Sequence, residues 1–242
     1  MDKFDWKLII SSNILKLKVL GLWPKDESFK PNLYTLWTII SLTVFMCGHN
    51  FFQIVNIIVN LNDLETITAT SFISLSTLVA LMKAFYVIRN MEILKKLMVT
   101  LNCDSFQPKN VRQISLFEPS LKFWKIVSSL CWTVSCGSVF FWSTYPIFDK
   151  SVKEHRLPFL AWYPYNTKIS PYYEITYVYQ VFCIIFLATT AVSVDNLIAA
   201  LNVYIGAQFD ILSDDVLHLY DVTTIIVEIF MYCWFGNEVE LK

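Results

Sequence analysis

The chain has 242 residues, of which 55% are hydrophobic, 16% aromatic and 16% charged, and its formal net charge at pH 7 is -1. A soluble domain of this length rarely combines so little charge with so many aromatic residues, so the composition favours a membrane protein. A chain of near-zero net charge also lacks the basic surface that nucleic-acid binding requires, which excludes nucleic acid as a partner. The partner that the composition favours is the lipid bilayer.

The first predicted element is a helix over residues 6–22. Its apolar residues, such as Leu15, Val19 and Leu22, alternate with lysines, the pattern of a helix lying in the membrane interface. A cytosolic amphipathic helix has the same pattern, so both positions remain open. The Trp-Pro pair at 23–24 ends the helix, because proline disfavours helical backbone at the residue before it.

The next two predicted elements are membrane spans at about residues 33–59 and 66–88. Each is an apolar run long enough to cross the hydrocarbon core, which needs about 20 helical residues. The turn between them is short, so the two helices should be antiparallel neighbours. We expect His49 in the first span to be packed rather than to act as a ligand or proton relay. Lys83, late in the second span, should extend to the lipid headgroups.

A long polar stretch, residues 89–125, separates the second predicted span from the third. It contains a predicted helix at 91–101 and a stop at Pro108, since proline cannot continue a helix. The third predicted span covers residues 126–148 and is uncharged until Asp149.

The fourth predicted span covers residues 175–205 and is preceded by a loop rich in proline and aromatic residues. Its first twenty residues carry no charge and would cover about 30 Å as a helix. Asp195, near the end of the span, should contact polar groups of a neighbouring helix or water. The loop carries rings of the kind that settle at a membrane–water boundary, namely Trp162, Tyr163, Tyr165, Tyr172 and Tyr173.

Beyond Gln208 the sequence no longer predicts a span. An acidic stretch, residues 210–221, is followed by an apolar run at 222–235 that Glu228 interrupts. This run is too short to cross a bilayer comfortably. We therefore expect it to lie at the membrane interface.

Lysine and arginine are distributed unequally among the connections. Six lysines precede the first span, no lysine or arginine lies between the first two spans, seven lie between the second and third, and four lie between the third and fourth. Cytoplasmic connections carry the excess of these residues. The distribution predicts a cytoplasmic N-terminus and an external loop before the fourth span, the reverse of a G-protein-coupled receptor.

Three of the predicted spans carry hydroxyl, aromatic and aliphatic residues at helical spacing in their outer halves. Residues three, four or seven positions apart share one face of a helix. Hydroxyls beside large rings would line an apolar cavity with few polar contacts, which suits a small volatile organic ligand. The same spacing also suits packing between helices, so the residues alone leave both interpretations open. The candidate ligand-binding residues are Thr68, Phe72, Leu75, Ser135, Ser138, Trp142, Tyr177, Val181 and Ile184.

The sequence contains no recognisable catalytic motif. HExxH, GxSxG, P-loop and glycine-rich nucleotide-binding patterns are all missing. His49, His155 and His218 lie in three separate regions, and the six cysteines lack metal-ligand spacing. We therefore expect no enzyme activity, no cofactor and no metal.

Several short strings, in their order along the chain, resemble the insect odorant receptor family. They are GLWP at 21–24, LPFLAWYPYN at 157–166, DNLIAAL at 195–201, QFDIL at 208–212 and YCWFGNE at 232–238. The resemblance implies an all-helical membrane protein that binds odorants between the outer halves of spans two, three, four and six. It also implies an odorant-gated cation channel, assembled with the odorant co-receptor in the plasma membrane of sensory neurons.

Compared with that family, the chain looks shortened. Residues 1–212 resemble the receptor membrane domain, and residues 213–242 resemble the cytoplasmic end of the sixth span. We therefore expect an all-α protein with four spans and a partial C-terminal apolar segment. Because the family's pore is lined by the seventh span, we expect this chain alone to conduct no ions. A gustatory-type receptor and a non-sensory four-span scaffold or transporter component remain as alternatives.

Overall fold

The computed structural model describes residues 4, 6–26 and 29–240, and every regular element in that part of the chain is helical. Lys3, one of the lysines before the first span, lies outside the described residues. The predicted all-α class is confirmed. The elements are α1 (Lys7–Val19), α2 (Leu33–Ser41), the π-helical η1 (Leu42–Gly48), α3 (His49–Val59), α4 (Leu64–Arg89), α5 (Met91–Leu101), the short η2 (Asp104–Phe106), α6 (Val111–Phe148), the short η3 (Ser151–Glu154) and α7 (Tyr172–Glu240).

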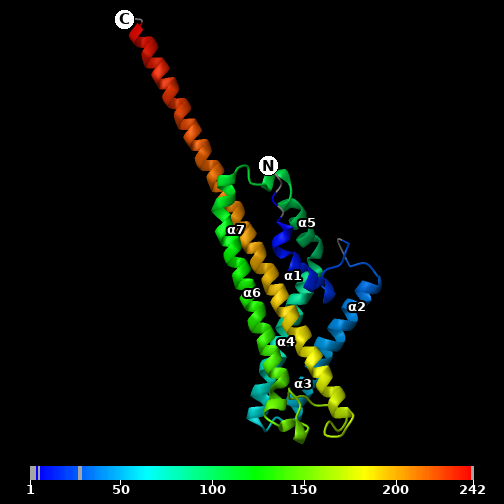
Figure 1. Ribbon diagram of the computed structural model, residues 1–242. Coiled ribbons are helices and arrows are strands. Elements are labelled where there is room, and N and C mark those ends of the chain that lie inside the picture. Colours follow the sequence, from blue (N-terminus) through cyan, green and yellow to red (C-terminus); the bar gives the residue numbers. More distant parts are fainter. Residues whose placement is uncertain (1–3, 5, 27–28, 241–242) are drawn as a thin grey trace.

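Four helical segments are long and apolar enough to cross a bilayer, as the sequence predicted. They are Leu33–Val59, which combines α2, η1 and α3, then Leu64–Arg89, Val111–Phe148 and Tyr172–Val227. Figure 1 shows these segments side by side in an elongated bundle. The turn between α3 and α4 and the loop between α6 and α7 lie at one end, and α1 and α5 lie at the other.

The interface between α3 and α4 contains hydrogen bonds between side chains. The two helices pack as neighbours, which the short turn predicted. The Ser74 hydroxyl donates to Asn50 Oδ1 at 2.7 Å, and Asn56 Nδ2 donates to Thr70 Oγ1 at 3.2 Å. Polar groups surrounded by lipid must find partners within the protein, so these two bonds help to set the register of α3 against α4.

The longest helices, α6 and α7, pack along each other. With 38 residues, α6 is about 57 Å long, nearly twice the thickness of the hydrocarbon core. Its first turns therefore extend into the polar stretch before the third predicted span.

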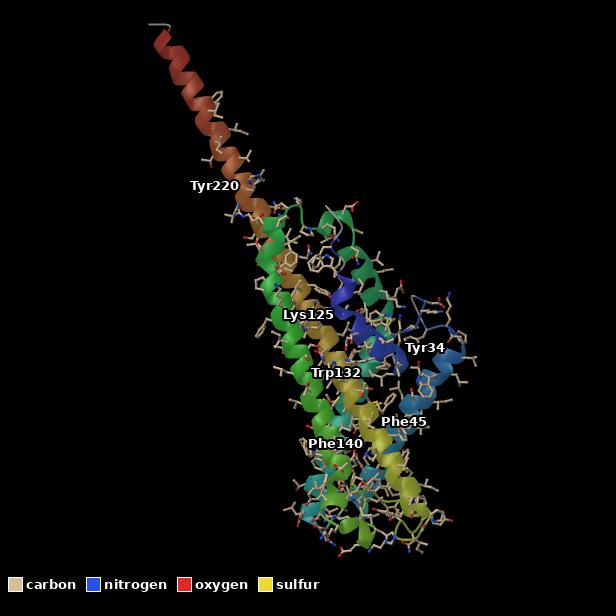
Figure 2. The ribbon with its side chains drawn as sticks, in the orientation of Figure 1. Tyr34, Phe45, Lys125, Trp132, Phe140 and Tyr220 are labelled. Carbon is tan, nitrogen blue, oxygen red and sulfur yellow. The ribbon has the colours of Figure 1, made fainter. Side chains whose placement is uncertain are left out.

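The structure continues α7 through the segment after Gln208, where the sequence predicted a separate run at the membrane interface. Residues 207–235 contain neither glycine nor proline, so no helix-breaking residue interrupts α7 within that range. Figure 2 shows Tyr220 on the part of α7 that extends beyond the bundle. The predicted break between the fourth span and this segment is not observed.

The first helix, α1, packs against α7. Its apolar face includes the fully buried Ile10 and Leu17, and it follows the fully buried Trp6. The ring of Trp6 lies 5.2 Å from that of Phe117 and 5.4 Å from that of Tyr204, measured between centroids. The Tyr204 hydroxyl also donates to the Trp6 carbonyl oxygen at 2.7 Å. The apolar face of α1 is thus covered by other helices of the same chain.

Candidate ligand-binding site

Two neighbouring cavities lie between α4, α6 and the loop that follows α6, and α7 closes the smaller one. Their volumes are about 700 Å³ and about 190 Å³. The larger volume is within the range typical of small-molecule sites. Phe140, labelled in Figure 2, shows the position of the two cavities along α6. Of its neighbours in the chain, Phe141 lines the larger cavity and Val139 lines the smaller one. The cavities adjoin, because they share Phe72, Ile73, Trp142 and Phe159.

The structure brings six of the nine candidate ligand-binding residues to these cavities. Two come from α4 and three from α6, whereas the predicted face of α7 contributes only Ile184. Phe72 and Trp142 line both cavities, and the other residues line one each. That they bind a ligand remains a prediction. The six are Thr68, Phe72, Ser135, Ser138, Trp142 and Ile184.

The other three candidates, Leu75, Tyr177 and Val181, line neither cavity. Leu75 is 62% exposed on the outer surface of α4. Tyr177 turns toward α6, where its hydroxyl donates to the Ser143 carbonyl oxygen. Val181 is half-buried. Helical spacing places these residues on a common face with true lining residues, but the rotation of each helix in the bundle decides which part of that face reaches the cavity.

The loop between α6 and α7 supplies a wall that the sequence analysis did not assign to the site. Residues 156–160 line the larger cavity, and Phe159 lines both. The available signal was the apolar string at 157–160 within a polar loop, because apolar residues in a connection tend to be buried against something. Further lining residues on the helices, which helical spacing did not single out, are Ala69, Ile73, Ser76, Val139, Phe141, Tyr145, Pro146, Leu187 and Ala188.

Phe159 is held in place by Gln180 of α7. Its backbone N–H donates to Gln180 Oε1, and Gln180 Nε2 donates to its carbonyl oxygen, each at 3.0 Å. The Phe159 ring stacks on Trp142, with centroids 5.7 Å apart and planes inclined by 16°. Both Phe159 and Gln180 are buried, so water cannot replace these bonds. Gln180 therefore positions an aromatic wall of both cavities.

Two of the rings predicted for the membrane–water boundary, Tyr163 and Tyr173, are buried in the fold. The ring of Tyr163 packs 4.7 Å from that of Phe52, and its hydroxyl accepts a hydrogen bond from Gln180 Nε2 at 3.2 Å. Burial raises the pKa of Tyr163, so its phenol stays neutral. The Tyr173 hydroxyl donates to the Arg156 carbonyl oxygen at 3.1 Å. Hydrogen bonds and ring contacts hold these two residues inside the loop, and their place at the membrane–water boundary stays a prediction. Partial exposure is found at Trp162, Tyr165 and Tyr172.

His49 and Gln53 of α3 are buried polar residues, each at most 1% exposed. The His49 ring lies 6.2 Å from that of Phe159 and 6.5 Å from that of Tyr179, both edge-on. The packed position predicted for His49 is confirmed. In the part of the chain that the structure describes, no group of three or more histidine, cysteine or acidic residues is arranged to hold a metal ion. The two cavities are lined mostly by apolar side chains, with a few hydroxyls and with Arg156 at the larger cavity.

The two charged residues predicted near the membrane boundary pair with each other. Lys83 Nζ lies 2.7 Å from Asp195 Oδ1, which joins α4 to α7. The contact expected for Asp195 with a polar group of a neighbouring helix is confirmed. Lys83 uses its length to reach this carboxylate, whereas the sequence predicted that it extends to the headgroups.

The fold and the cavities define a polytopic helical membrane protein with an apolar pocket between its spans. The profile of the family described as 7tm Odorant receptor matches residues 63–222. The chain therefore belongs to the seven-transmembrane odorant receptor family. This membership replaces the gustatory-type and non-sensory alternatives.

Two known proteins are similar to the chain. Odorant receptor Or1 of Anopheles gambiae is 24% identical over 212 residues, which cover 86% of this chain and 49% of the relative. The structure of the insect olfactory receptor OR5 from Machilis hrabei in complex with eugenol has a TM-score of 0.70 at 18% identity, covering 84% of this chain and 56% of that one. At that identity the structural likeness shows the fold alone. The chain spans about half the length of both proteins.

Proposed function

We propose that the paired cavities bind a small volatile organic molecule, and that the whole receptor uses this binding to gate a cation channel in the perception of smell. The observation that carries the proposal is an apolar cavity of about 700 Å³ between the spans of an odorant receptor family member. The similar OR5 was solved with eugenol, a small aromatic molecule, which supports a ligand of this kind.

The lining residues suit such a ligand physically. Phe72, Trp142 and Phe159 present aromatic surface against which a planar or branched hydrocarbon can pack. The hydroxyls of Ser135 and Ser138 lie in the smaller cavity and can orient one polar group of the ligand. The affinity would come mainly from apolar surface removed from water, at about 25 cal/mol for each Å².

In this proposal the whole receptor assembles with the odorant co-receptor and acts in the plasma membrane of sensory neurons, as a receptor and not as an enzyme. The excess of lysine and arginine in alternate connections supports a cytoplasmic N-terminus, with the paired cavities facing the outside. Residues 1–212 would form the membrane domain, and residues 213–242 would correspond to the cytoplasmic end of the family's sixth span.

Eugenol binding to the purified chain in lipid nanodiscs tests the ligand site. Because Trp142 lines both cavities, bound eugenol should quench its fluorescence, and Trp142→Phe should remove that part of the signal. Phe72→Ala should weaken binding about tenfold through the loss of an aromatic contact.

Phe85→Ala is the matched control, since Phe85 lies on the same helix, is 57% exposed and lines neither cavity. It should leave the affinity unchanged. Equal losses in the two variants, or no saturable binding of eugenol or of any member of a panel of volatile aromatics and terpenes, would refute the site.

A further inference from the structure

A third cavity lies at the opposite end of the bundle from the paired cavities. It has a volume of about 620 Å³ and is formed by α1, by the segment that follows α1 and by α5. Four lysines line it, Lys18, Lys25, Lys95 and Lys96, and its described lining contains no aspartate or glutamate. Like charges gathered around one cavity favour an anionic occupant.

Lys95 organises the wall of this basic cavity. Its Nζ donates to the carbonyl oxygens of Pro24, Lys25 and Asp26, with a distance of 3.1 Å to Lys25. These bonds hold the segment after α1 against α5 and so keep Lys25 beside the cavity. Lys96 pairs with Glu92 at 2.6 Å, so part of its charge is compensated. Lys18 and Lys25 are exposed and face solvent at the cavity.

The neighbourhood of the basic cavity is apolar on one side. Trp23 lines it, together with aliphatic residues of α1 and α5. Beside it, Val19 of α1 is 68% exposed, and Leu36 and Trp37 at the start of the first span are 52% and 44% exposed. The Trp37 indole N–H donates to the Val19 carbonyl oxygen at 3.0 Å, which ties α2 to α1 at this point. Charge and exposed apolar surface therefore meet where a span begins, the arrangement of a membrane–water boundary.

We propose that the basic cavity binds the headgroup of an anionic phospholipid, with Lys18 and Lys25 contacting the phosphate and the acyl chains lying on Val19, Leu36 and Trp37. A lipid fits better than a free anion because the exposed apolar surface adjoins the lysines. The lysine distribution places this end of the bundle at the cytoplasmic leaflet, which carries the anionic lipids. The lipid site would exist whether or not the paired cavities bind an odorant.

Native mass spectrometry of the purified chain in neutral detergent tests the lipid site, with dioleoyl phosphatidylserine as the probe. The wild-type chain should retain one phosphatidylserine in preference to dioleoyl phosphatidylcholine. The double variant Lys18→Gln/Lys25→Gln should bind that lipid about 25-fold more weakly, because each lysine near an anionic headgroup contributes roughly fivefold in affinity. Lys95 is left in place, since it holds the cavity wall.

The matched control is Lys122→Gln/Lys125→Gln, which removes the same charge from α6 outside the basic cavity. It should change the affinity by less than about twofold, because its lysines do not contact the headgroup. Equal loss in both double variants, or equal retention of phosphatidylcholine, would overturn the proposal. Displacement of the lipid by millimolar inorganic phosphate would assign the cavity to a free anion instead. Circular dichroism of every variant confirms that the helices remain folded.

Discussion

The two ends of the bundle are built differently. Where α1 meets α6 and α7, the buried residues are mainly apolar, and the ring of Trp6 contacts those of Phe117 and Tyr204. Where α4, α6 and the following loop meet, space for a small molecule remains, and Asn50 and Gln53 are buried nearby on α3. The aromatic cluster around Trp6 therefore stabilises the fold, while the end with the paired cavities leaves room for a ligand.

The largest effect expected is on stability, from Trp6→Ala. Trp6 is fully buried, so its truncation should cost about 3–5 kcal/mol of unfolding free energy. Phe72→Ala, at a side chain that is 73% exposed, should cost less than about 1 kcal/mol. Thermal unfolding of both variants in nanodiscs, followed by circular dichroism, measures the difference. Similar losses of stability in the two variants would contradict the difference proposed between the two ends of the bundle.

A smaller and more local effect is expected from Gln180→Leu. This change removes both hydrogen bonds to the Phe159 backbone and should cost about 1–3 kcal/mol, since the N–H and C=O groups are left buried without partners. Hydrogen exchange at the Phe159 amide should accelerate, and eugenol should bind more weakly as the aromatic wall loosens.

Gln208→Leu is the control for that experiment. Gln208 lies on the same helix and donates to the Phe106 carbonyl oxygen at 3.2 Å, at the other end of the bundle. It should leave exchange at Phe159 unchanged. Normal exchange at Phe159 in the Gln180→Leu variant would show that the loop is held by other contacts.

The smallest effect is expected from the ion pair that joins α4 to α7. Lys83 and Asp195 are 35% and 57% exposed, so solvent screens their attraction. A double-mutant cycle with Lys83→Gln and Asp195→Asn should give a coupling below about 1 kcal/mol that shrinks further at high salt. A coupling well above that value would mean that the pair is shielded from water in the bilayer.

Some residues of the candidate site could be predicted from the sequence, and others could not. Phe72 and Trp142 could be found from sequence, because helical spacing beside small hydroxyl residues is a local pattern. Phe159 could not be placed in the site in this way. Its position depends on Gln180, which lies 21 residues later in another element, and on stacking against Trp142 of α6. The unbroken course of α7 from Gln208 to Phe235 was open to prediction, since residues 207–235 lack glycine and proline.

The helical class and the four spans follow from the sequence alone, because helix propensity and runs of apolar residues are properties of short stretches of chain. The sequence also carried the short strings that resemble the odorant receptor family. The folded structure was needed to show which part of each helix faces the cavities, why Tyr163 is buried and which residue pairs with Lys83. These features depend on contacts between distant residues, as Lys83 and Asp195 show at a separation of 112 positions, and spacing within one helix carries no information about its rotation against the next.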